Sequence, residues 1–203
     1  MFWRDYVSRH FTNPIYLSER IENIIKSSEF LGKGNNGVVY RIDEHTIIKI
    51  FNEEKVCKKE YEVLRRSRKS SSFPKVYGHG RYYIIRDYVE GIRLDKYLNK
   101  NNFNFKLAKS VVELIRDFKK MQYKKLDIRC KDLYVQPDFS LKVIDPKNNF
   151  QREMPYPRHL MKGMHKRKKL EEFLDYVKFI DPILYKYWSE NVYLYLEKRQ
   201  NDK

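Results

Sequence analysis

The chain has 203 residues, enough for one large or two small domains. Its residues are 41% hydrophobic and 15% aromatic, a composition that excludes a disordered chain. Lys and Arg number 43 against 27 Asp and Glu, a formal charge of +16 that favours anionic partners. The two cysteines, Cys57 and Cys130, make no disulfide framework and match no zinc-ligand spacing.

The N-terminal residues carry no targeting signal that the sequence reveals. Charges at Arg4 and Asp5 interrupt the first apolar stretch, and no cleavage-site pattern follows. No run of about 18 apolar residues is present. We therefore expect an intracellular, cytoplasmic protein.

Residues 1–28 are predicted to form an N-terminal extension, helical over 18–25 with Ser18 as the N-cap. The part from 29 to 91 shows short runs of β-branched and aromatic residues, interrupted by one segment with helical spacing. The predicted strands are 30–31, 38–40, 46–51, 76–79 and 82–86, and the predicted helix is 53–68.

From residue 92 to 203 the pattern is mostly helical. Residues 105–120 place apolar side chains at helical spacing, and 170–199 contain two helices separated by Asp181 and Pro182. A short hairpin is predicted from 134–135 and 141–144. The fold class is therefore α+β, with a β-rich part that contains one helix and a reduced, mostly helical part.

A glycine-rich loop with the spacing Gly32-x-Gly34-x-x-Gly37 lies between two predicted strands. A dinucleotide-binding loop with the same spacing opens a helix instead. A glycine hairpin lets the backbone approach phosphate oxygens without Cβ clashes. An ordinary glycine hairpin is the alternative when this motif is taken alone.

Lys49 is the one charge in the apolar strand that precedes the first long helix. If it points inward it needs an anionic partner, although strand alternation can also place it in water. The helix that follows offers Glu60 as the preferred partner, with Glu62 as the competing candidate.

Acidic residues gather around the predicted hairpin of the second half. Asp132 precedes its first strand, and Asp145 ends its second strand. Carboxylates at the ends of neighbouring strands can hold Mg²⁺. Asp127 could orient or accept the proton of an incoming hydroxyl, and Arg129 could neutralise charge on a transferred phosphoryl group. Because Asp is common in turns, ordinary loop acids are the alternative.

At these positions, over about residues 29–150, the chain resembles the protein-kinase-like superfamily, and in particular small minimal bacterial Ser/Thr kinases and RIO-type atypical kinases. The resemblance implies a bilobal fold, with an N-lobe and hinge at 29–91 and a reduced C-lobe at 92–203, and it implies use of ATP and Mg²⁺. The nucleotide-binding residues that it implies are Gly32, Gly34, Gly37, Val39, Lys49, Glu60, Asp87 and Val89, the last two in an adenine-binding hinge. The implied catalytic residues are Asp127, Arg129 and Lys49, and the implied metal ligands are Asp132 and Asp145.

The chain departs from the family pattern at several points. Lys125-Leu126-Asp127 stands for His-Arg-Asp, Asp132 for the metal-binding asparagine, and Asp145-Pro146-Lys147 for Asp-Phe-Gly, and no Ala-Pro-Glu follows. Without the arginine and the phenylalanine, the usual routes of activation-loop control are missing. These departures suggest a constitutively assembled, partner-controlled or degenerate enzyme.

The motifs favour the prediction that the protein is a minimal serine/threonine protein kinase. Residues 151–169 contain seven Lys or Arg and one acid, which suggests an acidic or nucleic-acid-associated protein substrate, with a solvated basic face as the alternative. Two other functions stay open: a small-molecule kinase of the antibiotic or sugar type, and a degenerate nucleotide- or RNA-binding scaffold.

Overall fold

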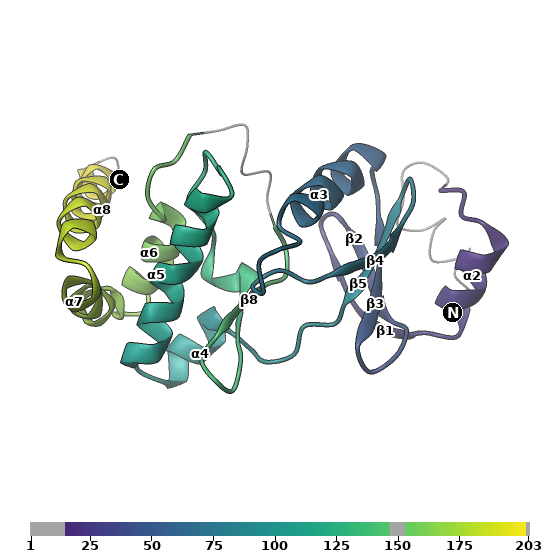
Figure 1. Cartoon of the computed structure of the whole chain (residues 1–203), viewed down its shortest axis with the longest axis horizontal. Coiled ribbons are helices and arrows are strands. Elements are labelled where there is room, and N and C mark those ends of the chain that lie inside the picture. Colours follow the sequence, from purple (N-terminus) through teal and green to yellow (C-terminus); the bar gives the residue numbers. More distant parts are fainter. Residues whose placement is uncertain (1–14, 147–152, 202–203) are drawn as a thin grey trace. The chain divides into compact units, whose positions relative to one another are not determined.

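The computed structural model describes residues 15–146 and 153–201, and these form two compact units. The first unit comprises the chain up to residue 69 together with 74–89, and the second comprises 70–73 and the chain from residue 90 onward. Both units contain helices and an antiparallel sheet (Figure 1), so the described chain has the predicted α+β fold class.

The first unit is built on a five-stranded antiparallel sheet with the order β1-β2-β3-β5-β4. Its strands are β1 (Glu29–Gly34), β2 (Gly37–Arg41), β3 (Thr46–Phe51), β4 (Val76–His79) and β5 (Tyr83–Asp87). Helix α3 (Glu54–Arg66) connects β3 to β4, and helix α2 (Glu19–Lys26) precedes β1. All five predicted strands and the predicted helix are therefore present.

The two helices cover opposite faces of this sheet. Ile21 and Ile25 of α2 pack in one cluster with Ile48 and Ile50 of β3. Lys49 lies between those isoleucines, so strand alternation turns it to the other face, where it meets α3. Burial on both faces explains why β3 is a nearly continuous apolar run instead of an alternating one.

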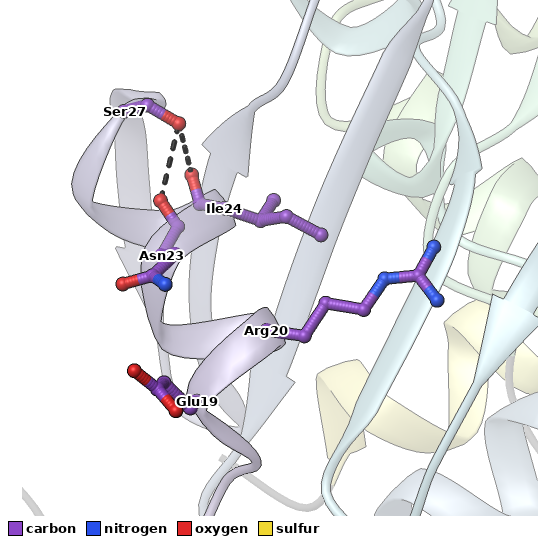
Figure 2. Close-up of a pocket in the computed structure, with 5 residues that line it drawn as sticks. All are labelled: Glu19, Arg20, Asn23, Ile24 and Ser27. Carbon is purple, nitrogen blue, oxygen red and sulfur yellow. Dashed lines mark hydrogen bonds between the residues drawn. The ribbon is translucent and has the colours of Figure 1, made fainter.

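Helix α2 lies within the segment predicted as an N-terminal extension, and it contributes apolar side chains to the core of the unit. Ser18 is its N-cap. At the other end, Ser27 Oγ donates to the carbonyl oxygens of Asn23 and Ile24, at 3.1 and 3.0 Å (Figure 2). Its polar residues form the solvent-facing side, consistent with an amphipathic surface helix.

The second unit is mostly helical (Figure 1). Its helices are α4 (Leu94–Lys100), α5 (Phe105–Lys120), α6 (Arg158–His165), α7 (Leu170–Ile180) and α8 (Pro182–Asn201). A small sheet joins β6 (Ile92–Arg93), β7 (Leu133–Val135) and β8 (Leu141–Val143), with the 3-10 turn η1 (Cys130–Asp132) leading into β7. No helix in the ranges described is long and apolar enough to cross a membrane.

Helix α5, the β7–β8 hairpin and helices α7 and α8 match the predicted elements. Asn104 caps α5 by accepting from the backbone N–H of Leu107 at 2.8 Å. Helices α4 and α6 and strand β6 were not predicted. The sequence of α6 is part of the basic segment, whose charges obscure the apolar side formed by Leu160, Met161 and Met164.

Candidate active site

The glycine-rich segment forms a tight β-hairpin, as the sequence predicts. Gly34 pairs with Gly37 across a two-residue turn of Asn35 and Asn36. Asn52, directly after β3, holds this turn: its side-chain amide donates to the Asn35 carbonyl at 3.2 Å and its backbone N–H to the Asn36 carbonyl at 3.0 Å. The turn is therefore anchored to the end of the neighbouring strand.

The three glycines do not serve the same purpose. Gly37 has a φ of +148°, and a Cβ there would lie 1.8 Å from the Ile50 carbonyl oxygen, so the fold itself requires glycine. A Cβ at Gly32 or Gly34 would meet nothing within 4 Å. Packing in the first unit therefore does not account for these two glycines, which leaves their backbone open to a ligand.

Lys49 and Glu60 form a buried ion pair in the first unit. Lys49 Nζ lies 2.6 Å from Glu60 Oε2, and the two side chains are 10% and 4% exposed. Glu60 is therefore the partner that the structure selects, because the competing candidate Glu62 is held on the surface by Arg65 and Arg66. Within the described ranges Glu60 Oε1 is buried without a hydrogen-bond partner.

The ion pair lies close in register to the glycine hairpin. Lys49 is opposite Val39 of β2 on one side and Ile84 of β5 on the other. Its ammonium group also lies 4.7 Å from the centre of the Phe51 ring. The glycine hairpin, Val39 and the lysine therefore lie on three consecutive strands of one sheet, β1, β2 and β3.

The predicted hinge begins at the end of β5. The backbone N–H of Asp87 donates to the Lys75 carbonyl at 3.0 Å, and that of Tyr88 donates to the His45 carbonyl at 2.6 Å. Because both amides are engaged within the first unit, Val89 is the remaining backbone donor of the predicted hinge. The buried Arg86 donates to the Asp87 carbonyl at 3.3 Å.

In the second unit, backbone hydrogen bonds fix the loop that carries the predicted catalytic residues. Leu126 N–H donates to the Met154 carbonyl at 2.7 Å. At the other end of the loop, Ile144 N–H donates to the Asp132 carbonyl at 3.0 Å, which brings the residue before Asp145 beside Asp132. The two predicted metal ligands are thus brought to neighbouring backbone positions.

Arg129 connects these two carboxylates. Its Nε and Nη2 atoms lie 2.6 and 2.8 Å from the two oxygens of Asp132, and Nη2 is also 3.6 Å from Asp145 Oδ2. The bidentate bond to Asp132 raises the pKa of Arg129 above its ordinary value. The guanidinium that was predicted to neutralise a phosphoryl group therefore has carboxylate partners inside its own unit.

The Asp132 and Asp145 pair fits a Mg²⁺ ion that arrives with a nucleotide. Such an ion is held by one or two carboxylates, with phosphate oxygens and water completing the shell. Across the ranges the structure describes, no group of three or more His, Cys, Asp or Glu side chains forms a metal cluster, so a two-carboxylate site is the form available. A bound ion would compete with Arg129 for both acids.

Asp127 is the most enclosed of the predicted site residues in this unit. Its side chain is 1% exposed, and one oxygen accepts from the backbone N–H of His159 at 2.8 Å. The other oxygen contacts Nδ1 of the same histidine ring. His159 belongs to the basic segment 151–169, and the sequence did not single it out, because 32 residues separate it from Asp127 and no local pattern links them.

These side chains surround a pocket of about 250 Å³. It is lined by Lys125, Asp127, Ile128, Arg129, Asp132 and His159. The pocket therefore combines two cations, two carboxylates and one imidazole, a donor and acceptor set suited to a hydroxyl or phosphoryl group.

Several residues of the basic segment have internal partners. Arg167 donates to the carbonyls of Asp95 and Gly163 at 2.9 and 2.8 Å. Arg158 lies over the Tyr195 ring, and Lys169 is 3.7 Å from Glu172. Lys147 and Arg152 lie outside the described residues. Much of the charge predicted to face a substrate thus also stabilises the second unit.

The first unit has the β-rich sheet with one connecting helix and the lysine–glutamate pair that the superfamily resemblance implies. The described chain as a whole has the expected α+β fold class. No family model and no curated protein matches the sequence.

Two solved structures are similar to parts of this chain. A ternary complex of APH(2'')-IIa with streptomycin and ATP matches with a TM-score of 0.37 and 20% identity over 50% of this chain and 38% of that one. A co-crystal of WbdD with a kinase inhibitor matches with a TM-score of 0.46 and 16% identity over 57% of this chain and 32% of that one. The matched region thus spans well under half the length of either protein.

Proposed function

We propose that this protein is an ATP- and Mg²⁺-dependent phosphotransferase that moves the γ-phosphoryl group of ATP to a hydroxyl. The observation that carries the proposal is the buried pair of Lys49 and Glu60 beside the glycine hairpin. A buried lysine is costly unless it is paired, and here Glu60 fixes the ammonium group on β3, the neighbour of the strand β2 that completes the glycine hairpin. That is an arrangement suited to binding phosphates.

The residues divide the proposed chemistry between the two units. In the first unit, Gly32 and Gly34 would cover the phosphates, Lys49 would contact them, and Val89 would donate to the adenine. In the second unit, Asp132 and Asp145 would hold Mg²⁺, which supplies charge neutralisation at the phosphates. Arg129, which lines the same pocket, would neutralise charge on the transferred group.

For the acceptor, we propose a serine or threonine side chain. The pocket around Asp127 is lined by Lys125 and Arg129, and their charge disfavours a polycationic acceptor of the aminoglycoside type. An uncharged or anionic small molecule would not meet that repulsion, so a small-molecule kinase is the second candidate.

The test is transfer of labelled γ-phosphate from Mg-ATP to the protein itself, to an acidic protein mixture and to a panel of sugars and aminoglycosides. We expect label on Ser or Thr with the wild type, and none with Lys49→Met. Lys55→Met, which removes an exposed lysine from the same unit, serves as the matched control and should keep the activity. Label confined to a small molecule would replace the protein-kinase proposal, and failure to bind ATP would overturn the phosphotransferase proposal.

A further inference from the structure

Asp127 occupies the position from which the resemblance implies that a carboxylate receives the acceptor hydroxyl. Its side chain is 1% exposed, and both of its oxygens contact His159. A general base must come within hydrogen-bond distance of the proton that it removes. The carboxylate is therefore poorly placed to meet an incoming hydroxyl, although it belongs to the lining of the pocket.

The His159 side chain is 40% exposed and lines the same pocket. It lies in the first turn of α6, directly after Arg158, and its backbone N–H is engaged by Asp127 Oδ1. Asp127 thus holds this residue at two points, the backbone amide and Nδ1 of the ring. Two-point contact fixes the position of the imidazole more firmly than a single hydrogen bond would.

A carboxylate that accepts from Nδ1–H selects the tautomer in which the other ring nitrogen, Nε2, carries a free lone pair. A buried aspartate that orients a more exposed histidine is the arrangement in which histidine acts as the general base. In this geometry Asp127 would orient the imidazole and His159 would remove the proton, two tasks that a single aspartate would otherwise perform.

We propose that Asp127 and His159 form a dyad in which His159 Nε2 removes the proton from the acceptor hydroxyl. This inference rests on the proposed phosphotransferase function. As the acceptor oxygen forms its bond to the γ-phosphorus, the bond from that phosphorus to the bridging oxygen breaks and ADP leaves with the electron pair. The hydroxyl proton moves to Nε2 and is later released to water, while Asp127 holds the ring through Nδ1.

Charged groups of both signs surround the ring. Asp127 contacts the imidazole, and Lys125 and Arg129 belong to the lining of the same pocket. Asp132 is neutralised by its bidentate bond to Arg129. On the α6 side, the neighbouring Arg158 lies over the Tyr195 ring, and Tyr156, whose pKa is raised by burial, stays neutral.

The first test compares two substitutions of the histidine. Asn at position 159 retains a side-chain N–H that can donate to Asp127, whereas Ala does not. A dyad predicts that both His159→Asn and His159→Ala lower kcat by at least about 100-fold, with little change in KM for ATP. His165→Asn, at the exposed end of the same helix, is the matched control and should behave as the wild type.

Retention of activity within a few-fold in His159→Asn would overturn the proposal, because the histidine would then only position Asp127. A second readout needs no turnover: ¹⁵N NMR of the histidine rings in the intact protein. We expect wild-type His159 to be protonated at Nδ1 and unprotonated at Nε2 at neutral pH, and Asp127→Ala to abolish this preference. An Nε2-protonated ring would overturn the dyad. Absence of phosphoryl transfer in the wild type would instead contradict the proposed function, whatever the tautomer.

Discussion

Lys49 Nζ and Glu60 Oε2 lie 2.6 Å apart on the face of the first sheet that α3 covers. Neither side chain has more than a tenth of its surface exposed. The pair joins the central strand β3 to the helix that follows it, so one contact both secures α3 and places an ammonium group near the glycine hairpin. Its energetics can be tested without knowledge of the substrate.

Removing one partner should be far more harmful than removing both. Lys49→Met leaves a buried carboxylate without its cation and should lower the free energy of unfolding by about 3 kcal/mol. The double variant Lys49→Met/Glu60→Leu should recover at least half of that loss. Urea unfolding followed by circular dichroism gives both values, with Lys55→Met as an exposed control. Equal destabilisation by the single and double variants would contradict a buried pair.

Substituting different glycines of the hairpin should affect different properties, either the stability of the fold or the affinity for ATP. Gly37→Ala places a Cβ against the Ile50 carbonyl in a left-handed backbone conformation and should cost at least about 2 kcal/mol of stability. Gly34→Ala should stay within about 0.5 kcal/mol yet weaken ATP binding about tenfold, if this backbone covers phosphates. Calorimetric titration and thermal unfolding distinguish the two effects. A Gly34→Ala protein with unchanged ATP affinity would remove this glycine from the proposed site.

The local features of the first unit could be read from the sequence because they depend on neighbouring residues. The β-branched run of β3 and the lysine within it predict a strand with a buried charge. The helix that follows begins three residues after β3, which limits the candidates for the partner of Lys49 to a few acids. The sequence therefore favoured Glu60 and left Glu62 open, and the structure pairs Lys49 with Glu60.

The environment of Asp127 could not be predicted in this way. His159 is 32 residues away. Its helix α6 lies in a segment rich in Lys and Arg, a composition typical of an exposed surface. Likewise, the sequence does not reveal that Arg129 turns to Asp132 and Asp145. Contacts of this kind depend on how distant segments pack, which local patterns do not encode.

Asp181 links two helices of the second unit. Its Oδ1 accepts from the backbone N–H of Leu184 at 2.9 Å, and its Oδ2 lies 2.7 Å from Arg116. Asp181→Ala should therefore reduce stability by about 1 kcal/mol, whereas the exposed Asp175→Ala on α7 should change it little.

The pH dependence of this effect has a definite sign. The hydrogen bond from Leu184, followed by that from Arg116, lowers the pKa of Asp181 below its usual 3.8. The stabilisation is thus present above that value and is lost as the pH falls through the lowered pKa. The difference in unfolding free energy between the wild type and Asp181→Ala should shrink as the solution is acidified from pH 6. A constant difference down to the acid limit would exclude an ionised cap.

In the absence of metal, the positive charge of Arg129 should balance the negative charge of the Asp132 carboxylate. Arg129→Met leaves the buried Asp132 carboxylate without its bidentate donor and should destabilise the protein by about 2 kcal/mol in the presence of a chelator. Added Mg²⁺ should then raise the melting temperature of the variant more than that of the wild type. Arg65→Met, which removes an exposed arginine of α3, should show no such gain. Equal shifts in all three proteins would argue against a metal site here.

The most direct measurement of the phosphotransferase account is the single-turnover rate of γ-phosphoryl transfer from Mg-ATP to the acceptor that the panel identifies, with Asp145→Asn beside Asp138→Asn. Asp138 lies in the exposed turn between β7 and β8, where it accepts from the Ser140 backbone. We predict that Asp145→Asn lowers the rate at least about 100-fold and that Asp138→Asn leaves it unchanged. A wild type that binds Mg-ATP but transfers no phosphate, or an Asp145→Asn protein as fast as the wild type, would contradict the account.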